Sequence, residues 1–203
     1  CSLRGFDRRL VLITKSGEVM TGHTITFNLS VSSVKAAIKD LEDYKKDLAN
    51  KCNMLSQKLA EKGVEIAKAE IISLDAVFTS ELLESIHSEK TGSGIWAVIA
   101  GTNHCAFVEF GTGQVGQSSP YPYEFPDGVS WAYNSGRTIR QAMEDIVIHG
   151  STFVKAGEYY WTYIGKDGKL HITKGMPSRP FMHNTANELR DIIEETAREV
   201  FGA

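Results

Sequence analysis

The sequence predicts an α+β domain in which a long N-terminal helix and a C-terminal helix pack on an antiparallel sheet of hairpins. Two stretches, residues 32–62 and 180–200, carry apolar residues at the three- and four-residue spacing of amphipathic helices. Between them, short apolar runs flank glycine-containing turns, which is typical of β-hairpins. Because the strands follow one another in pairs and do not alternate with helices, we expect antiparallel pairing.

The long helix is expected to begin at Ser32 or Ser33, either of which can serve as an N-cap, and to end near Lys62. Gly63, the next residue, favours termination. Apolar residues at or beside a seven-residue repeat form one face of this helix: Val34, Ile38, Leu41, Leu48, Cys52, Leu55 and Leu59. Such a face lies on a core or pairs with another helix in a coiled coil, and the shortness of the repeat favours the core.

Three hairpins are predicted from pairs of apolar, β-branched runs. Their strands are residues 10–14 with 24–29, 95–100 with 106–110, and 159–164 with 169–173. The segments that join the strands are rich in polar residues and glycine. They contain Lys15-Ser16-Gly17-Glu18 in the first pair, Gly101-Thr102-Asn103-His104 in the second and Gly165-Lys166-Asp167-Gly168 in the third.

Other segments are shorter or less regular. Residues 79–86 are typical of a short helix that Thr79 caps, and residues 137–148 have the apolar spacing of one helix face. Residues 64–74 fit a helix or a strand. A loop rich in Ser, Pro and Gly is expected over residues 114–128.

The composition argues against several classes of function. A net charge of -3 gives no support for a protein that neutralises nucleic-acid phosphates, and no apolar run is long enough to span a bilayer. The three cysteines, Cys1, Cys52 and Cys105, are odd in number and widely spaced, which argues against a disulfide framework and fits a reducing cytoplasm. The six histidines show no metal-ligand spacing, so neither a metal nor a cofactor is expected.

A G-x-G-x-x-G pattern at residues 111–116 matches the dinucleotide fingerprint literally. That fingerprint needs a helix starting at its third glycine, and Pro120, Pro122 and Pro126 leave no room for a long one. We therefore expect no nucleotide there.

Cys105, Glu109 and Arg179 are the residues that most invite a chemical interpretation. Cys105 follows His104, but neighbours in a strand point to opposite faces, so the two do not form a nucleophile–base pair by themselves. A buried Glu109 needs a partner, and Arg179, held between two prolines, is the most constrained guanidinium in the chain. The hypothesis is a Glu109–Arg179 ion pair; the alternative is that both side chains are exposed.

Three segments occur in a distinctive order ahead of the end of the chain: residues 75–86, 106–113 and 176–185. Their signature residues are Glu109, Gly111, Thr112, Gly113, Arg179, Pro180 and Phe181. Together with the long helix before them, these segments resemble the tail-completion (neck) family of long-tailed bacteriophages, over roughly residues 21–200. The family's start would correspond to Met20, so residues 1–19 are expected to be an extension. Residues 20–203 would form one α+β domain with an insertion at about 117–172, where the sequence departs from shorter members.

The resemblance implies a structural virion protein at the head–tail junction, a minor tail component assembled in the bacterial cytoplasm. Such a protein forms a homo-oligomeric ring, docks the head-side connector and tail proteins, and is not an enzyme. DNA would pass through the lumen without specific binding, which the mild negative charge suits. The loop that contains Tyr121, Tyr123 and Phe125 is a candidate docking element, since proline-ordered aromatics lose little entropy on binding; alternatively these aromatics cover the sheet.

Two alternatives from other classes stay open. One is a small cytosolic enzyme that uses Cys105 or Glu109, which would need a pocket with converging titratable groups. The other is an adaptor module that binds one partner as a monomer. The adaptor differs from the phage protein chiefly in forming no ring.

Overall fold

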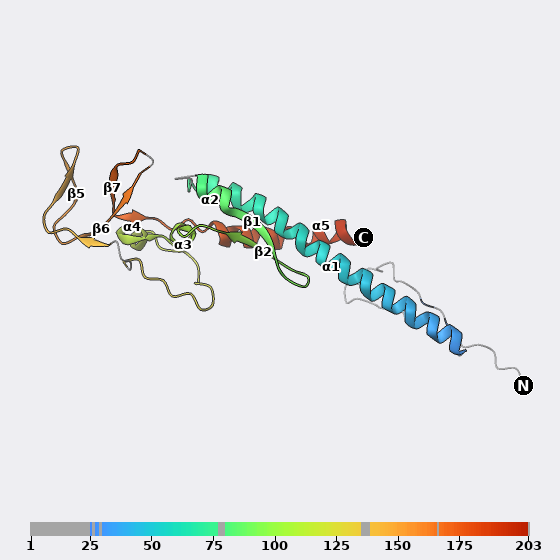
Figure 1. Ribbon diagram of the computed structural model, residues 1–203. Helices are drawn as coiled ribbons and strands as arrows, with labels where there is room; N and C mark the ends of the chain where they lie inside the picture. Colours follow the sequence, from blue (N-terminus) through green and yellow to red (C-terminus); the bar gives the residue numbers. More distant parts are fainter. Residues whose placement is uncertain are drawn as a thin grey trace, which may run out of the picture. The chain divides into compact units, whose positions relative to one another are not determined.

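A computed structural model describes most of the chain: residues 25, 27, 28, 30–76, 80–134, 139–165 and 167–202. Within these residues the α+β class is confirmed, with a long N-terminal helix, a C-terminal helix and small antiparallel sheets (Figure 1). Three predictions lie largely outside the described residues: the N-terminal extension over 1–19, the hairpin of residues 10–29, and the cap at Thr79.

The chain divides into two compact units by its internal contacts. One unit comprises Cys1–Ala60, Glu89–Ala97 and Asp191–Ala203, and the other comprises Glu61–Ser88 and Val98–Arg190. The prediction of one domain with an insertion at about 117–172 stays a prediction.

Helix α1 spans Val31–Ser73, so the prediction that it ends near Lys62 is wrong. Gly63 lies inside the helix because the neighbours come close: a Cβ there would lie 2.7 Å from Val98 Cγ2 and 3.0 Å from Leu189 Cδ1. Residues 64–73, which fitted a helix or a strand, continue α1. The helix ends in a Schellman motif, in which left-handed Asp75 (φ 50°) is followed by an Ala76 N–H···O=C Ile71 bond of 2.9 Å.

Helix α2 (Ser80–Ser85) confirms the predicted short helix and leads directly into the first hairpin. Strand β1 (Ile86–Gly92) pairs with β2 (Ile95–Ala100) through a turn that contains Gly94 at φ 70°. Pairing of residues 95–100 with 106–110 is therefore wrong.

Residues 106–110 are not a strand but belong to helix α3 (Cys105–Phe110), and the predicted turn before them opens this helix. The Val108 N–H donates to His104 O over 3.1 Å, a helical bond. A second short helix, α4 (Gly113–Ser118), occupies the start of the predicted loop. The run Ala-Phe-Val-Glu-Phe is too short for apolar spacing to distinguish helix from strand.

The segment between α4 and α5 is built from hairpins. Strands β3 (Arg140–Gln141), β6 (Tyr159–Ile164) and β7 (Leu170–Thr173) form a three-stranded antiparallel sheet, and β4 (Ile146–Ile148) pairs with β5 (Ser151–Val154). The predicted hairpin of β6 and β7 is confirmed.

The helix predicted over residues 137–148 is wrong. His149 (φ 51°) and Gly150 (φ 79°) form the two-residue turn of the β4–β5 hairpin instead. A His-Gly turn between β-branched runs outweighs an apolar spacing that matches a helix by coincidence. Strand β8 (Gly175–Met176) follows β7 and precedes helix α5 (Phe181–Phe201), which is as predicted.

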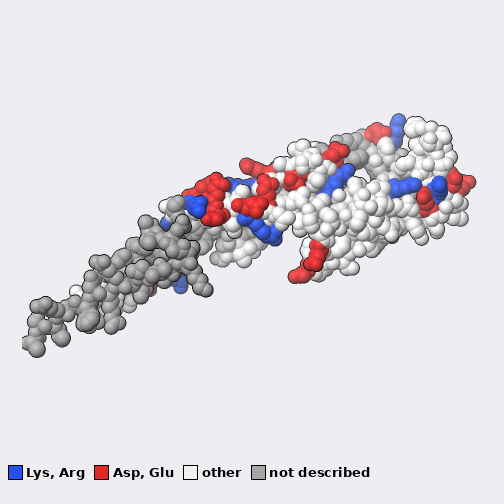
Figure 2. Space-filling view, turned by 180° about the vertical axis from the view of Figure 1, so that it is seen from behind, with Lys and Arg blue, Asp and Glu red and all other residues white. Residues whose placement is uncertain are grey.

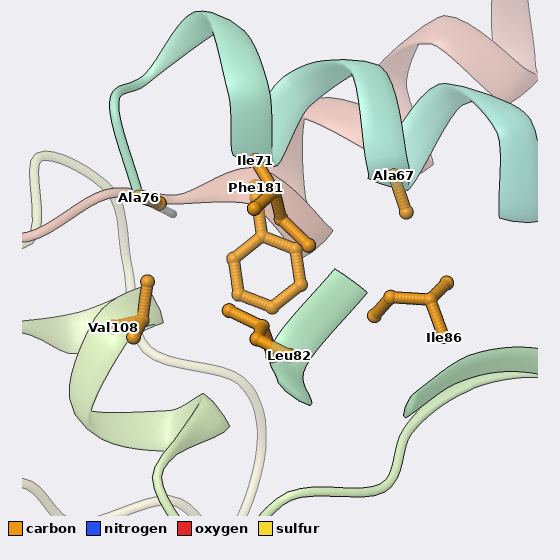
Figure 3. Close-up of a cluster of buried hydrophobic side chains, with 7 residues drawn as sticks. All are labelled: Ala67, Ile71, Ala76, Leu82, Ile86, Val108 and Phe181. Atoms are coloured by element: carbon orange, nitrogen blue, oxygen red, sulfur yellow. The ribbon is translucent and has the colours of Figure 1, made fainter. Parts of the chain in front are cut away.

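The core gathers the C-terminal part of α1, α2, the start of β1, α3 and the start of α5. Its buried residues are Ala67, Ile71, Ala76, Leu82, Ile86, Val108 and Phe181. Figure 3 shows the Phe181 ring between Ile71 and Leu82, and all three side chains are fully buried. Burying Phe181 fixes the first residue of α5 in the core.

The apolar face predicted to lie on the core does not do so in the N-terminal part of α1. Ile38, Leu41 and Leu48 are 51%, 55% and 40% exposed, whereas the core uses Ala67 and Ile71 further along the helix.

Candidate functional site: the joint between α3 and α5 and the pocket beside it

The two signature segments of the sequence lie against each other. Thr112 forms an antiparallel bridge with Met176, and Gly113 forms one with Gly175. The Arg179 N–H donates to Val108 O over 2.9 Å. These bonds join the end of α3 to the segment that enters α5, and we call this region the α3–α5 joint.

Two glycines make the close approach possible. Gly111 has φ 80° and ψ 165°, a conformation that glycine alone adopts readily, and a Cβ there would lie 2.7 Å from Ser178 N. Gly113 has φ 66°, and a Cβ there would overlap Lys174 O and the Trp161 ring. The glycines of the G-x-G-x-x-G pattern thus serve packing, and the helix that starts at Gly113 has only six residues.

Glu109 is the buried polar residue at the centre of the joint. It is 6% exposed, and its carboxylate accepts the Met182 N–H over 2.9 Å and the His183 N–H over 3.1 Å. It therefore caps the first turn of α5 from another helix, where a negative charge also meets the positive end of the helix dipole. Burial raises its pKa from 4.5 to about 6, against the lowering effect of the two backbone N–H donors.

The predicted Glu109–Arg179 ion pair is wrong. The Arg179 side chain donates from Nε to Leu74 O over 3.0 Å, and the Ser178 hydroxyl donates to Glu109 O over 2.6 Å. Each charged group instead satisfies backbone groups that a helix end leaves without an intrahelical partner, the N–H groups of α5 for Glu109 and a carbonyl after α1 for Arg179. The predicted function of the pair, to hold the glycine turn to the start of the last helix, is performed by these separate bonds.

Pro180 and Phe181 complete the signature. Pro180 lies just before α5, and its carbonyl accepts the Asn184 N–H over 3.0 Å, the first helical bond. Phe181, the first residue of the helix, is 0% exposed.

An open, mainly apolar pocket of about 530 Å³ lies beside the joint. Its lining includes Cys105, Glu109, His183, Tyr121 and Ala186, from α3, the loop after α4 and α5. A pocket of this volume is in the range that accepts a small ligand or a few side chains of a partner.

The predicted docking loop contacts α3 and the start of α5. Tyr121 is 7% exposed and packs edge-on against Phe110, with ring centroids 5.0 Å apart. Tyr123 stacks on His183 at 3.6 Å and is 42% exposed, and Phe125 is 36% exposed. One aromatic of the three is thus buried, while the other two present part of their surface to solvent.

Sequence reasoning missed the contacts that three residues make in this region. Trp131 Nε1 donates to Gly111 O over 2.9 Å, the Tyr133 hydroxyl accepts the Tyr121 N–H over 3.0 Å, and His183 carries the Tyr123 stack. No spacing in the sequence links Trp131 or Tyr133 to Gly111. A carboxylate expected to be buried could, however, have been matched to the N-terminus of a predicted helix.

The described residues contain no group of three or more His, Cys, Asp or Glu side chains that could hold a metal ion. None of the described helices is both long and apolar enough to cross a membrane. No protein-family model, curated protein or solved structure matches this chain. Fold and site thus define an α+β protein whose most distinctive residues hold a helix junction beside an apolar pocket.

Proposed function

We propose that this protein is a structural component at the head–tail junction of a tailed bacteriophage, a tail-completion or neck protein. It acts by forming a homo-oligomeric ring and by docking the head-side connector and tail proteins. It is assembled in the bacterial cytoplasm and resides in the virion. The resemblance of the sequence to that family motivates the proposal.

The observation that carries the proposal is that the signature residues make structural contacts. Both carboxylate oxygens of Glu109 accept backbone N–H groups, and Arg179 Nε donates to a backbone carbonyl. Gly111 and Gly113 allow close packing. These residues hold the joint together, as an assembly protein requires.

The pocket beside the joint is the docking element of this proposal. Tyr123 and Phe125, at 42% and 36% exposed, stack on His183 and Tyr121 of its lining, and partly exposed aromatics beside an apolar pocket are typical of binding hot spots. An apolar side chain of a neighbouring subunit or tail protein would fill it.

The charge distribution suits a protein that DNA passes without binding. The net charge is -3, and on the face shown in Figure 2 acidic and basic side chains lie intermingled. A surface that grips DNA would instead gather basic side chains along the path of the phosphates.

The test is the solution mass by light scattering, with negative-stain images of any large species. A closed ring of about six or more subunits is expected, a cyclic assembly of the usual kind. Ala186→Trp, which fills the pocket from an exposed position of α5, should prevent docking, whereas Glu188→Trp, on the same helix and outside the pocket lining, should not. A monomer at every concentration that also binds no head or tail protein would contradict the proposal.

A second candidate function rests on the titratable groups of the pocket. Cys105, Glu109 and His183 all line it, which an enzyme using Cys105 or Glu109 would require. A screen of thiol reactivity separates the two functions. An assembly protein should have an ordinary Cys105, whereas fast and selective labelling of Cys105, lost in His183→Ala, would favour the enzyme.

A further inference from the structure

The N-terminal part of α1 carries an apolar stripe that the rest of the described chain does not bury. Val31, Ile38, Leu41 and Leu48 are 73%, 51%, 55% and 40% exposed, and Cys52 is exposed. These residues are spaced three, four or seven apart along one continuous helix, so they lie on one face of it. A contiguous apolar surface of this kind marks an interaction site.

Two contacts within the same compact unit use other positions of the helix, and Leu55 and Leu59 of the stripe are half-buried. Trp96 Nε1 donates to Asn53 Oδ1 over 3.4 Å, and Lys58 forms an ion pair with Glu199. Asn53 and Lys58 each lie outside the a and d series described below. Charged side chains occupy further positions outside those series: Lys39, Asp40, Asp43, Lys46 and Asp47.

The residue types along the stripe indicate what covers it. With Val31 as a heptad position a, the a positions are Val31, Ile38, Lys45, Cys52 and Leu59, and the d positions are Val34, Leu41, Leu48 and Leu55. Two of the five a residues are β-branched and three of the four d residues are leucine, and β-branched residues at a with leucine at d favour a parallel two-stranded coiled coil. One polar residue at an a position specifies register and number of strands. Lys45 is that polar residue.

From this pattern we infer that residues 31–59 form a parallel, in-register coiled coil with the same segment of a second copy of this chain. The paired segments would run for roughly 40 Å at the rise of an α-helix. Identical helices related by a two-fold axis satisfy the pattern with themselves, so the interface needs no other partner. The inference is independent of the proposed function, because a protein of any function can pair through this helix.

In-register pairing brings the two copies of Cys52 face to face, since equal a positions meet across the two-fold axis. The test uses the full chain with Cys1→Ser and Cys105→Ser, so that Cys52 is the one remaining thiol. Mild oxidation should convert most of the protein to a disulfide-linked dimer. The matched control moves the thiol to exposed position f of the same helix, with Cys52→Ser and Asn50→Cys, and should give little dimer.

A second measurement needs no cysteine. Leu48→Glu should raise the dimer dissociation constant roughly 100-fold, because each dimer would bury two unpaired carboxylates. Asn50→Glu, on the outer face, should leave it unchanged. Sedimentation of both variants over a range of concentrations gives the constants.

Several outcomes would overturn the inference. Equal cross-linking through positions 50 and 52 would indicate random collision. Absence of a Cys52 cross-link in a protein that does dimerise would indicate antiparallel pairing, in which the two copies of Cys52 lie far apart. A chain that stays monomeric, with Cys52 unreactive toward a maleimide, would show that another segment of the same chain covers the stripe.

Discussion

Glu109 combines burial with a charge, and this makes the stability of the joint depend on pH. Its pKa is raised to about 6 in the folded protein from 4.5, mainly by loss of solvent. The folded state therefore binds more protons than the unfolded state between these values. The stabilising contribution of the protonated group is full below about pH 4.5 and is lost as the pH rises through about 6.

We predict that Glu109→Gln removes this dependence. On going from pH 7 to pH 4, the free energy of unfolding of the wild type should rise relative to the variant by about 2 kcal/mol. Urea unfolding at a series of pH values measures the difference, in which all other titrating groups cancel. Glu124→Gln, in the exposed loop, is the control and should run parallel to the wild type. A difference between wild type and Glu109→Gln that stays constant with pH would show that the carboxylate is not desolvated.

Gly111 offers a matched comparison with Gly128, since their φ angles are 80° and 79°. A Cβ at Gly111 would lie 2.7 Å from Ser178 N, whereas nothing lies within 4 Å of one at Gly128. Gly128→Ala should cost about 1 kcal/mol for backbone strain alone, and Gly111→Ala should cost about 3 kcal/mol because the joint must open as well. Equal losses of unfolding free energy in the two variants, measured with urea, would mean that the α3–α5 joint accommodates the added methyl group without destabilisation.

The sequence identified the residues of the joint better than it identified their bonds. Glu109 and Arg179 were singled out by expected burial and proline restriction, and Gly111 and Phe181 belong to the segments that carry the family resemblance; all four lie in the joint. Their partners are backbone groups at helix ends, and the sequence does not show where helices meet. Reading residues 106–110 as a strand also misplaced Glu109, because a helix buries Val108 and Glu109 side by side.

Among the elements, α1 contains a glycine that the sequence predicted to lie at its end. Gly63 is a helix-terminating residue by propensity, yet it lies within a 43-residue helix because Val98 and Leu189 pack against its bare backbone. Replacing an interior glycine by alanine ordinarily stabilises a helix by about 1 kcal/mol.

We predict the opposite sign at this position. Gly63→Ala should destabilise the protein by about 1 kcal/mol or more, because its Cβ would lie 2.7 Å from the stiff, β-branched Val98. In a Val98→Ala background the space is available, and Gly63→Ala should stabilise by about 1 kcal/mol. Urea midpoints of the wild type, the two single variants and the double variant measure the reversal. If Gly63→Ala changes the stability in the same direction in both backgrounds, the packing argument is contradicted.

Elements with a long repeating apolar pattern, or with two apolar runs that flank a turn, were predictable from the sequence. Short elements were not. Helix α5 repeats its apolar spacing over 21 residues, and β6 and β7 flank a glycine-containing turn. By contrast, α3 has six residues, and β4 has three that also fit a helical spacing. For such short runs tertiary contacts decide the conformation, and the sequence pattern carries too few repeats to reveal them.

At the scale of the whole molecule, stability is distributed unevenly along α1. Ala67 and Ile71 are 0% exposed in the core, whereas all ten residues from 41 to 50 are exposed. An isolated helix of that length is marginal in water, because helix stability in proteins comes mainly from the packing of one face. A partner at residues 31–59 would therefore stabilise the helix as well as dimerise the chain.

This leads to a prediction for hydrogen exchange. In the monomeric variant Leu48→Glu, amides of residues 41–50 should exchange far faster than those of residues 63–73, which the core protects. In the wild type, where residues 31–59 are inferred to pair, residues 41–50 should gain protection of roughly tenfold or more, since opening them then requires separating the two helices. Asn50→Glu should behave as the wild type, which separates loss of pairing from the addition of a charge. If residues 41–50 are as well protected in monomeric Leu48→Glu as residues 63–73 are, the stripe is covered within one chain and the helix needs no second copy.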